Sequence, residues 1–316
     1  MIHDIKKTVQ HFYTTNPTWL VVIRWATATG KTRLSVELSQ HVPIEVLSAD
    51  SRQVYRYMDI WTDKISNDIR EKLPHHLIDI ITPDQSYTAG QRKQDIYNLI
   101  PQIQQRGNHA FVVWGTGLYI DMLYKNFAMP DVPPQEEWRI AMYEKETQNP
   151  WFLYKEVYRV DPQEAQKHHP NSLRYLLRAL EIYTFTGQTK TTLSVEQPVD
   201  RPVLMIGLRR EKEETNILIN ARIKEMFSHG LIEEVQWLLK QGYSPTLQSM
   251  QGIGYKEIVG YLQGEYNREK AEELLKRNTH HLAKKQRTRF RRYIMDAKTA
   301  PKTNVEYQVI LMSNEK

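Results

Sequence analysis

The sequence predicts an α/β fold in which a mainly parallel sheet forms the core, an all-helical domain is inserted into it, and a basic helical region follows towards the C-terminus. Three observations lead to this prediction. Apolar runs alternate with helical patterns over residues 20–125, as they do where helices connect parallel strands. Residues 135–187 contain no convincing strand. Lysines and arginines then gather between Lys276 and Arg292 without an intervening glycine or proline, which favours a helix with one basic face.

The first strand is predicted at residues 20–24, which begin with a continuous apolar run. A loop ending in Gly30, Lys31 and Thr32 follows, and residues 32–40 are predicted to be a helix. This context is typical of a phosphate-binding loop, in which backbone N–H groups and the helix N-terminus face an anion. The core is therefore predicted to be P-loop NTPase-like. The predicted diphosphate- or nucleotide-binding residues are Trp25, Ala26, Thr27, Ala28, Thr29, Gly30, Lys31 and Thr32.

Within this loop, Lys31 would reach the terminal phosphates, and the Thr32 hydroxyl would bind a Mg²⁺ ion. A second strand, at residues 44–48, delivers Asp50 to its carboxyl end. That edge is where open α/β sheets carry their chemistry.

Later elements follow from the same patterns. Strands are predicted at residues 110–114 and 202–208, and helices at residues 88–105 and 215–241. The strand pattern breaks at a proline-rich segment near residues 129–134. We therefore expect three segments: the first part of the core at 1–125, the inserted helical domain at 126–198, and the return to the core with basic C-terminal helices at 199–316.

The composition is ordinary for a soluble protein: of 316 residues, 40% are apolar and 25% charged. We expect no membrane segment, because there is no run of about 18 apolar residues and no signal peptide. The lack of cysteine excludes disulfides and cysteine-built zinc sites, and it favours the reducing cytoplasm. The net charge of +6 and the basic helix allow two interpretations, a solvated charged face or a surface that contacts nucleic-acid phosphates.

Several further motifs occur in a specific order. The segment Ser48–Tyr55 carries Asp50, and it is followed by Pro74–Asp79, Gly115–Tyr119, Arg178–Glu181, Met250–Glu257 and Thr279–Thr288. Together with the phosphate loop, these motifs resemble those of the bacterial tRNA dimethylallyltransferases, the tRNA isopentenyltransferase family. The resemblance runs from about Leu20 to Arg292.

The resemblance implies transfer of a dimethylallyl group from dimethylallyl diphosphate to the exocyclic amine of adenosine 37 in tRNA, with Mg²⁺ as cofactor. Asp50 matches the family's catalytic aspartate, which would take the amine proton as general base. Thr27 matches a position near the bridging oxygen of the diphosphate, and Arg222, on a looser pattern, a position near the diphosphate itself.

The resemblance also implies a partner, the anticodon stem-loop of tRNA, from which the enzyme must extrude the target base. A monomer is the default expectation. Thr116 matches a threonine that helps to fix the flipped base. The residues predicted to contact tRNA are Asp50, Ser51, Arg52, Gln53, Thr116, Arg174, Arg178, Lys284, Lys285 and Arg287.

Some of these residues have structural alternatives. Asp50 could be the N-cap of a helix beginning at Ser51. Arg174 and Arg178 lie one helical turn apart and could pair with Glu181 instead of RNA. His75, His76 and Asp79 look like metal ligands, but no further ligand is spaced convincingly to complete a metal site with them. The resemblance implies a structural role for this segment.

Three tryptophans stand where the resembled family has glycine: Trp25, Trp61 and Trp114, with Trp237 as a candidate fourth. One hypothesis covers them all, namely that UGA encodes glycine in the source organism and has been read as tryptophan. The other two are a degenerate pseudoenzyme and true tryptophans accommodated by compensating changes. Glycine makes up only 13 of the 316 residues, which favours the first hypothesis.

Other functions remain as alternatives: an adenylate isopentenyltransferase, a P-loop kinase and a non-catalytic tRNA-binding pseudoenzyme. The inserted helical domain and the basic helix argue against transfer to a free nucleotide, which needs neither. No acidic magnesium ligand follows the predicted strand at 110–114, which argues against a kinase.

Overall fold

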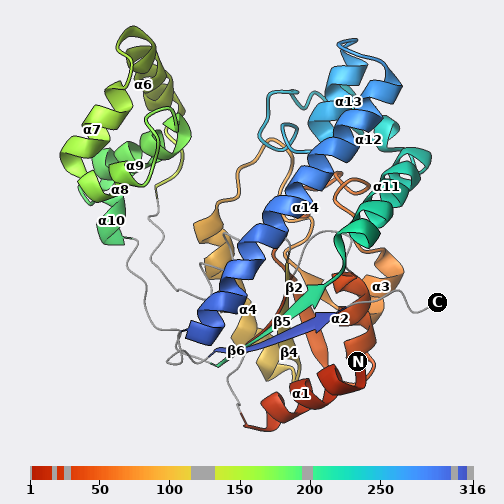
Figure 1. Cartoon of the computed structure of the whole chain (residues 1–316). Coiled ribbons are helices and arrows are strands. Elements are labelled where there is room, and N and C mark those ends of the chain that lie inside the picture. Colours follow the sequence, from red (N-terminus) through yellow and green to blue (C-terminus); the bar gives the residue numbers. More distant parts are fainter. Residues whose placement is uncertain are drawn as a thin grey trace. The chain divides into compact units, whose positions relative to one another are not determined.

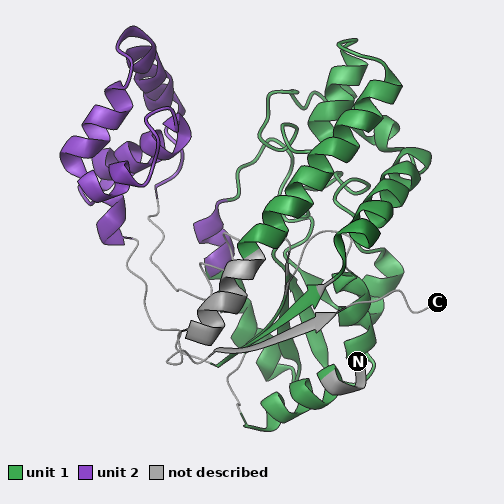
Figure 2. Cartoon of the chain, viewed as in Figure 1, with its two compact units in different colours: residues 1–87, 94–120, 199–316 green, residues 88–93, 121–198 purple. Residues whose placement is uncertain are grey.

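The computed structural model describes residues 2–15, 20–24, 30–114, 132–193, 202–299 and 305–311. The chain divides into two compact units (Figure 2). Unit 1 comprises Met1–Tyr87, Gln94–Ile120 and Val199–Lys316, and unit 2 comprises Thr88–Lys93 and Asp121–Pro198.

The centre of unit 1 is a parallel sheet with the order β3-β2-β4-β1-β5-β6 among the described residues (Figure 1). Its strands are β1 (Leu20–Arg24), β2 (Ile44–Ser48), β3 (His75–His76), β4 (His109–Trp114), β5 (Val203–Arg209) and β6 (Val305–Leu311). The four strands predicted from apolar runs are confirmed to within one residue at each end. β3 and β6 were not predicted from the sequence, and the presence of β6 means that the basic C-terminal region is not wholly helical.

The apolar runs form the interior of the sheet because helices cover both of its faces. Residues 20–23 of β1 are buried, and so is every residue of β2. The helices of unit 1 are α1 (Ile2–Thr15), α2 (Lys31–Ser39), α3 (Asn67–Lys72), α4 (Ala89–Gln105), α11 (Lys212–Ser228), α12 (Leu231–Lys240), α13 (Tyr255–Leu262) and α14 (Arg268–Thr299). The first residues of α4 belong to unit 2.

The prediction of one helix at residues 215–241 is wrong. The chain turns at His229 and Gly230, and two helices, α11 and α12, result. Gly230 has φ 93°, a left-handed conformation that suits glycine because it lacks a Cβ atom. This turn allows both helices to contribute to one apolar cluster in unit 1, through side chains such as Ile223 and Val235.

Glu45 fixes strand β2 to its neighbours although it is a buried carboxylate. It accepts hydrogen bonds from Arg106 Nε at 2.8 Å and Nη2 at 2.6 Å, and from Asn108 at 2.8 Å. The hydrogen bonds from Arg106 are the main cause that lowers the pKa of Glu45 to about 2. The strand that leads to Asp50 is thus held by a satisfied ionic network.

The candidate metal ligands of the sequence all have protein partners. His76 Nε2 lies 2.5 Å from Glu45, and His75 Nδ1 lies 2.6 Å from the carbonyl of Leu73. Asp79 pairs with Lys64 and Arg70. No cluster of three or more His, Cys, Asp or Glu side chains suited to a metal ion occurs in the described ranges.

Unit 2 is a helical bundle, and its described residues at 132–193 contain no strand, as predicted. Its helices are α6 (Glu136–Gln148), α7 (Phe152–Val160), α8 (Pro162–Gln166), α9 (Leu173–Thr186) and α10 (Lys190–Leu193). The side chains of Leu176, Leu177, Leu180 and Ile182 on α9 are buried, and Leu176 and Leu177 share one apolar cluster with Leu153 and Val157. Gly187, at φ 69°, ends α9. Within the ranges that the structure describes, no helix is both long and apolar enough to cross a membrane.

Candidate active site

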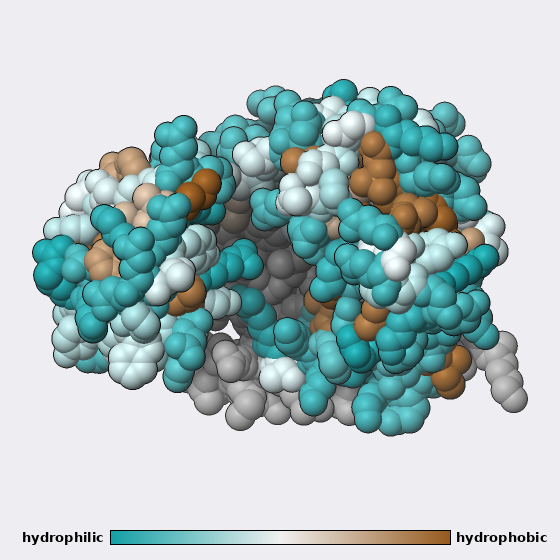
Figure 3. Space-filling model, turned by 90° about the horizontal axis from the view of Figure 1, so that it is seen from above, coloured by the Kyte–Doolittle hydropathy of each residue, from teal (hydrophilic) through white to brown (hydrophobic). Residues whose placement is uncertain are grey.

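A cavity of about 420 Å³ lies in unit 1, with walls from the segment after β2, the start of α2, and helices α11 and α14. Its polar lining consists of Lys31, Asp50, Ser51, Arg52, Thr62, Arg222, Thr279, Lys285, Gln286 and Arg289, and its apolar lining of Trp61, Ile219, Ile223, Met226, Ile253 and Leu282. The molecular face in Figure 3 is mainly hydrophilic with small apolar patches. The cavity instead combines charged groups with an apolar wall, which suits a ligand that is anionic at one end and apolar at the other.

Lys31 reaches the cavity because α2 begins at this residue, directly after Gly30 at φ 90°. Burial lowers the pKa of Lys31 to about 8, and the nearby charge of Asp50 opposes this shift. Arg222 lowers the same pKa further, so two cationic side chains lie close enough to repel each other. An anion bound between them would relieve that repulsion.

Asp50 lies just beyond the end of β2 and lines the cavity. Its Oδ1 accepts the backbone N–H of Arg52 at 2.8 Å, and the residues that follow form turns. The alternative of a helix N-cap is therefore wrong, because no helix starts at Ser51. The local turn fixes the carboxylate at the sheet edge, in the same cavity as Lys31.

Arg222 lines the same cavity as Asp50 and Lys31. It lies on α11, and its Nη1 is 3.3 Å from Asp63 Oδ2. Ile219, Ile223 and Met226 line the cavity from the same helical face. Their spacing of three and four residues accounts for this shared orientation.

Arg52 lines the cavity, and its guanidinium also fixes the segment before α13. Nη1 donates to the carbonyl of Gln248 at 2.9 Å and to that of Ser249 at 3.2 Å. A Cβ atom at Gly252 would lie 2.7 Å from Arg52 Cζ. The glycine there is what allows the backbone to approach the guanidinium.

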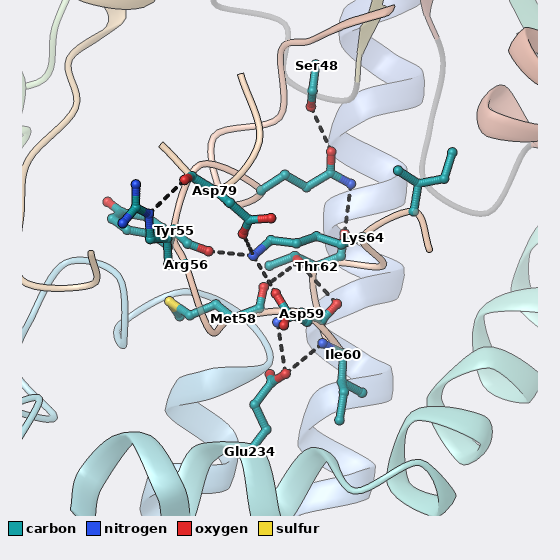
Figure 4. Close-up of polar contacts among 12 residues, drawn as sticks. Ser48, Tyr55, Arg56, Met58, Asp59, Ile60, Thr62, Lys64, Asp79 and Glu234 are labelled. Atoms are coloured by element: carbon teal, nitrogen blue, oxygen red, sulfur yellow. Dashed lines mark hydrogen bonds and ion pairs between the residues drawn. The ribbon is translucent and has the colours of Figure 1, made fainter. Parts of the chain in front are cut away.

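Gln53 does not line the cavity, although the sequence predicted a tRNA contact for it. Its Oε1 accepts from Ser48 Oγ at 2.7 Å, and its Nε2 donates to the carbonyls of Thr62 at 3.1 Å and Asp63 at 3.3 Å (Figure 4). The side chain connects the end of β2 to the cavity wall. Its position supports a structural role in this brace and gives no support to an RNA contact.

The basic helix α14 supplies one side of the cavity. Lys285 lines it and is exposed, Lys284 is exposed, and Arg287 is half-buried. The sequence analysis did not assign Gln286 and Arg289 to the site. The helical spacing of Thr279, Leu282, Gln286 and Arg289 could have identified this face of α14.

The remaining predicted site residues differ in what the structure shows. Thr32 is exposed in the first turn of α2. Residues 25–29, with Trp25, Ala26, Thr27, Ala28 and Thr29, lie outside the described residues, as does Thr116. Arg174 is exposed on α9.

Arg178 has an intramolecular partner in unit 2. Its Nη1 lies 2.6 Å from Oε2 of the fully buried Glu181, and its Nη2 donates to the carbonyl of Val132 at 2.9 Å. Arg139 binds the same carboxylate through two contacts of 2.8 Å. The alternative of pairing with Glu181 is therefore confirmed for Arg178, and it joins α6 to α9 through a buried carboxylate.

Three tryptophans of the described residues bear on the question of glycine at these positions. Trp61 lines the cavity, and a Cβ atom at Gly254 would lie only 2.2 Å from its ring. Trp237 is 42% exposed. Trp151, which the sequence did not single out, is 54% exposed and has φ 69°, the left-handed region that favours glycine. Among the tryptophans of the described residues, position 151 is the one whose backbone conformation favours glycine.

A family model and individual related proteins both match most of this chain. The family model described as IPP transferase matches residues 53–293. The tRNA dimethylallyltransferase of Pelotomaculum thermopropionicum is 41% identical over 276 residues, which are 87% of this chain and 88% of that protein. The tRNA dimethylallyltransferase of Halothermothrix orenii is 43% identical over 288 residues, which are 90% of this chain and 87% of that protein.

Solved structures show the same similarity. The full-length tRNA isopentenylpyrophosphate transferase from Bacillus halodurans aligns with a TM-score of 0.66 and 36% identity, covering 94% of this chain and 92% of that one. A eukaryotic dimethylallyltransferase acting on tRNA aligns with a TM-score of 0.75 and 25% identity, covering 92% of this chain and 74% of the other. The α/β fold predicted from the sequence is thus shared with these proteins.

Proposed function

This chain belongs to the IPP transferase family, and we propose that it transfers a dimethylallyl group from dimethylallyl diphosphate to the exocyclic amine of adenosine 37 in tRNA. The observation that carries this proposal is one cavity that contains Lys31, Asp50 and Arg222 together with an apolar wall. The protein is an enzyme that acts in tRNA modification.

In the reaction, the adenine amine nitrogen forms a bond to C1 of the dimethylallyl group as the C1–O bond to the diphosphate breaks. The electron pair of that bond leaves with the diphosphate, and the surplus proton of the amine passes to the Asp50 carboxylate. Lys31 and Arg222 stabilise the negative charge that develops on the leaving group. Ile219, Ile223 and Met226 supply the apolar surface that suits the dimethylallyl chain.

A magnesium ion fits the proposed diphosphate site. Thr32 is exposed beside Lys31, so its hydroxyl is accessible to a ligand at the N-terminus of α2. One protein oxygen together with phosphate oxygens and water is a common set of Mg²⁺ ligands. When bound, the ion would neutralise charge on the diphosphate.

We propose the anticodon stem-loop as the part of tRNA that binds, and action in the cytoplasm as a monomer. The exposed Lys284 and Lys285 beside the cavity and the exposed Arg174 of unit 2 are suited to phosphate contacts. We propose, as the resemblance implies, that Thr27 contacts the diphosphate and that Thr116 contacts the flipped base. The target adenine must leave the base stack to reach Asp50.

The test is an in vitro transfer assay. The protein is incubated with dimethylallyl diphosphate, Mg²⁺ and a tRNA transcript that carries A37, and the tRNA nucleosides are analysed by mass spectrometry. The proposal expects dimethylallyl adenosine from this transcript and none from a transcript with G37. Product formed from AMP but not from tRNA would favour the adenylate isopentenyltransferase alternative. If the tryptophan form and the form with glycine at positions 25, 61 and 114 both bind tRNA without making product, the protein is a pseudoenzyme.

Neutralising Lys284 and Lys285 together is expected to weaken tRNA binding and to flatten its salt dependence. Each lost phosphate contact should reduce the slope of log K against log[salt] by about 0.7–0.9. Filter binding at several salt concentrations measures both quantities. The control is the pair Lys240→Gln and Lys270→Gln, which are exposed lysines outside the cavity lining. Unchanged affinity and slope in the first variant would show that this face of α14 is only solvated.

A further inference from the structure

The segment that forms one wall of the cavity is held in place by a carboxylate from outside the cavity. Residues 59–63 follow the turn that carries Asp50, and they include Trp61 and Thr62, which line the cavity. Glu234 on α12 accepts the backbone N–H groups of both Asp59 and Ile60 at its Oε2, each at 2.8 Å (Figure 4). Its other oxygen, Oε1, accepts the hydroxyl of Tyr255 at 2.8 Å.

These bonds fix the carboxylate from two sides. The carboxylate belongs to Glu234 on α12, and Tyr255, which donates to it, is fully buried on α13. Helices α12 and α13 therefore set the position of this carboxylate. Two adjacent backbone donors that meet one carboxylate oxygen have little freedom to move apart. Charge-assisted hydrogen bonds of this kind are about twice as strong as neutral ones.

The other end of the segment leads to the reacting groups. Asp63 Oδ2 lies 3.3 Å from Nη1 of Arg222, which lines the cavity. Lys64, whose side chain is only 3% exposed, binds the carboxylates of Asp59 and Asp79, both at 2.5 Å (Figure 4). A displacement of residues 59–60 should therefore also move Asp63, because only two residues separate Ile60 from Asp63. The segment is held at one end by Glu234 and contacts Arg222 at the other.

We infer that Glu234 is a positioning residue for the transfer reaction, acting on Arg222 through residues 59–63 and Asp63. This inference rests on the proposed function, because Arg222 is assigned there to the leaving diphosphate. Glu234 is not among the residues that line the cavity. Its contribution is to the geometry of the cation that meets the leaving group, so its loss should slow the chemical step and leave tRNA binding intact.

The experiment compares Glu234→Ala with Glu233→Ala, which removes an exposed carboxylate from the same turn of α12. We expect Glu234→Ala to lower kcat about 10- to 100-fold with little change in the KM for tRNA, the scale expected from a misplaced catalytic group. Glu233→Ala should match the unchanged protein. Glu234→Gln should recover most of the rate, because its amide oxygen can accept both N–H groups while Tyr255 accepts from its amide nitrogen.

A double-mutant cycle with Asp63→Asn tests the route. If Glu234 acts through Asp63, Glu234→Ala combined with Asp63→Asn should be no slower than the slower single variant. The inference would be overturned if the fold-losses in kcat of the two single variants multiplied in the double variant. An equal loss of kcat in Glu233→Ala, or a normal kcat in Glu234→Ala, would also overturn it. If Glu234→Ala does not fold, Glu234→Asp, which retains the charge on a shorter side chain, should show a smaller loss of the same kind, and a normal kcat there would also overturn it.

Hydrogen exchange separates this inference from the proposed function. The amides of Asp59 and Ile60 should exchange faster in Glu234→Ala than in Glu233→Ala, whether or not the protein transfers dimethylallyl groups. If the unchanged protein is inactive on tRNA while the exchange result holds, the proposed function fails and the clamp on residues 59–60 stands. Unchanged exchange at both amides would overturn the clamp itself.

Discussion

Replacing Asp50 with asparagine is expected to lower the single-turnover rate of dimethylallyl transfer by at least ~100-fold, the scale of general-base catalysis. The amide has nearly the same shape as the carboxylate, and its oxygen can still accept the backbone N–H of Arg52, which Asp50 Oδ1 accepts at 2.8 Å. The turn after β2 should therefore persist. What the variant loses is a base for the amine proton, so tRNA affinity should change little.

The matched control is Asp68→Asn, an exposed carboxylate on α3 that does not line the cavity. Rapid-quench measurement with excess enzyme isolates the chemical step, and filter binding gives the tRNA affinity. A near-normal transfer rate in Asp50→Asn would remove the carboxylate from its role as base. A large loss of tRNA affinity without a loss of rate would instead assign Asp50 to binding.

Glycine in place of tryptophan at positions 25 and 114 is expected to restore binding of dimethylallyl diphosphate, which the tryptophan form should bind poorly. Glycine lets the backbone of such loops approach a ligand closely, whereas a tryptophan side chain adds roughly 150–250 Å² of surface. Trp25 belongs to the predicted phosphate loop, and Trp114 ends β4 just before the Gly115-Thr116-Gly117 segment. Isothermal titration of the double variant and the tryptophan form with the diphosphate, followed by the transfer assay, measures the effect.

The same hypothesis predicts the composition of the native protein. If UGA encodes glycine in the source organism, native peptides should contain glycine at positions 25, 61 and 114. Because the backbone at position 151 is left-handed, the native peptide that contains this position should also be sequenced for glycine. Tryptophan at positions 25, 61 and 114 in the native protein would reject the decoding hypothesis. Robust turnover by that tryptophan form would then reject the pseudoenzyme as well and leave accommodation.

Local patterns in the sequence were sufficient to predict the elements that build the site. The apolar runs of β1 and β2 and the Gly30-Lys31-Thr32 sequence are local signals, and they place the predicted site residues Lys31 and Asp50 at the carboxyl edge of the sheet. The structure places Lys31, Asp50 and Arg222, which had been predicted from the order along the chain and from similarity to a family, in the lining of one cavity.

The features that the sequence did not predict depend on distant partners. The side chain of Gln53 is hydrogen-bonded to Ser48 and Thr62 because the chain folds back after β2. No local sequence pattern predicts this change of direction. The sequence offered Glu181 as a partner for Arg178, but it gave no sign that Arg139, on another helix, shares this buried carboxylate. The break at Gly230 was missed because the apolar spacing continues on both sides of it.

The strand order has a consequence for the synthesis of this protein. β1 lies between β4 and β5, and the residues of unit 2 at 121–198 separate those two strands along the chain. While the ribosome translates unit 2, β1 can pair with β4 only, and its other edge waits for β5. The helices of unit 2 make mostly local contacts and can fold during this interval, whereas the sheet is completed late. Nascent chains that stop before residue 203 should therefore expose an apolar strand edge and depend on chaperones, a liability that ends when β5 and then β6 add to the sheet.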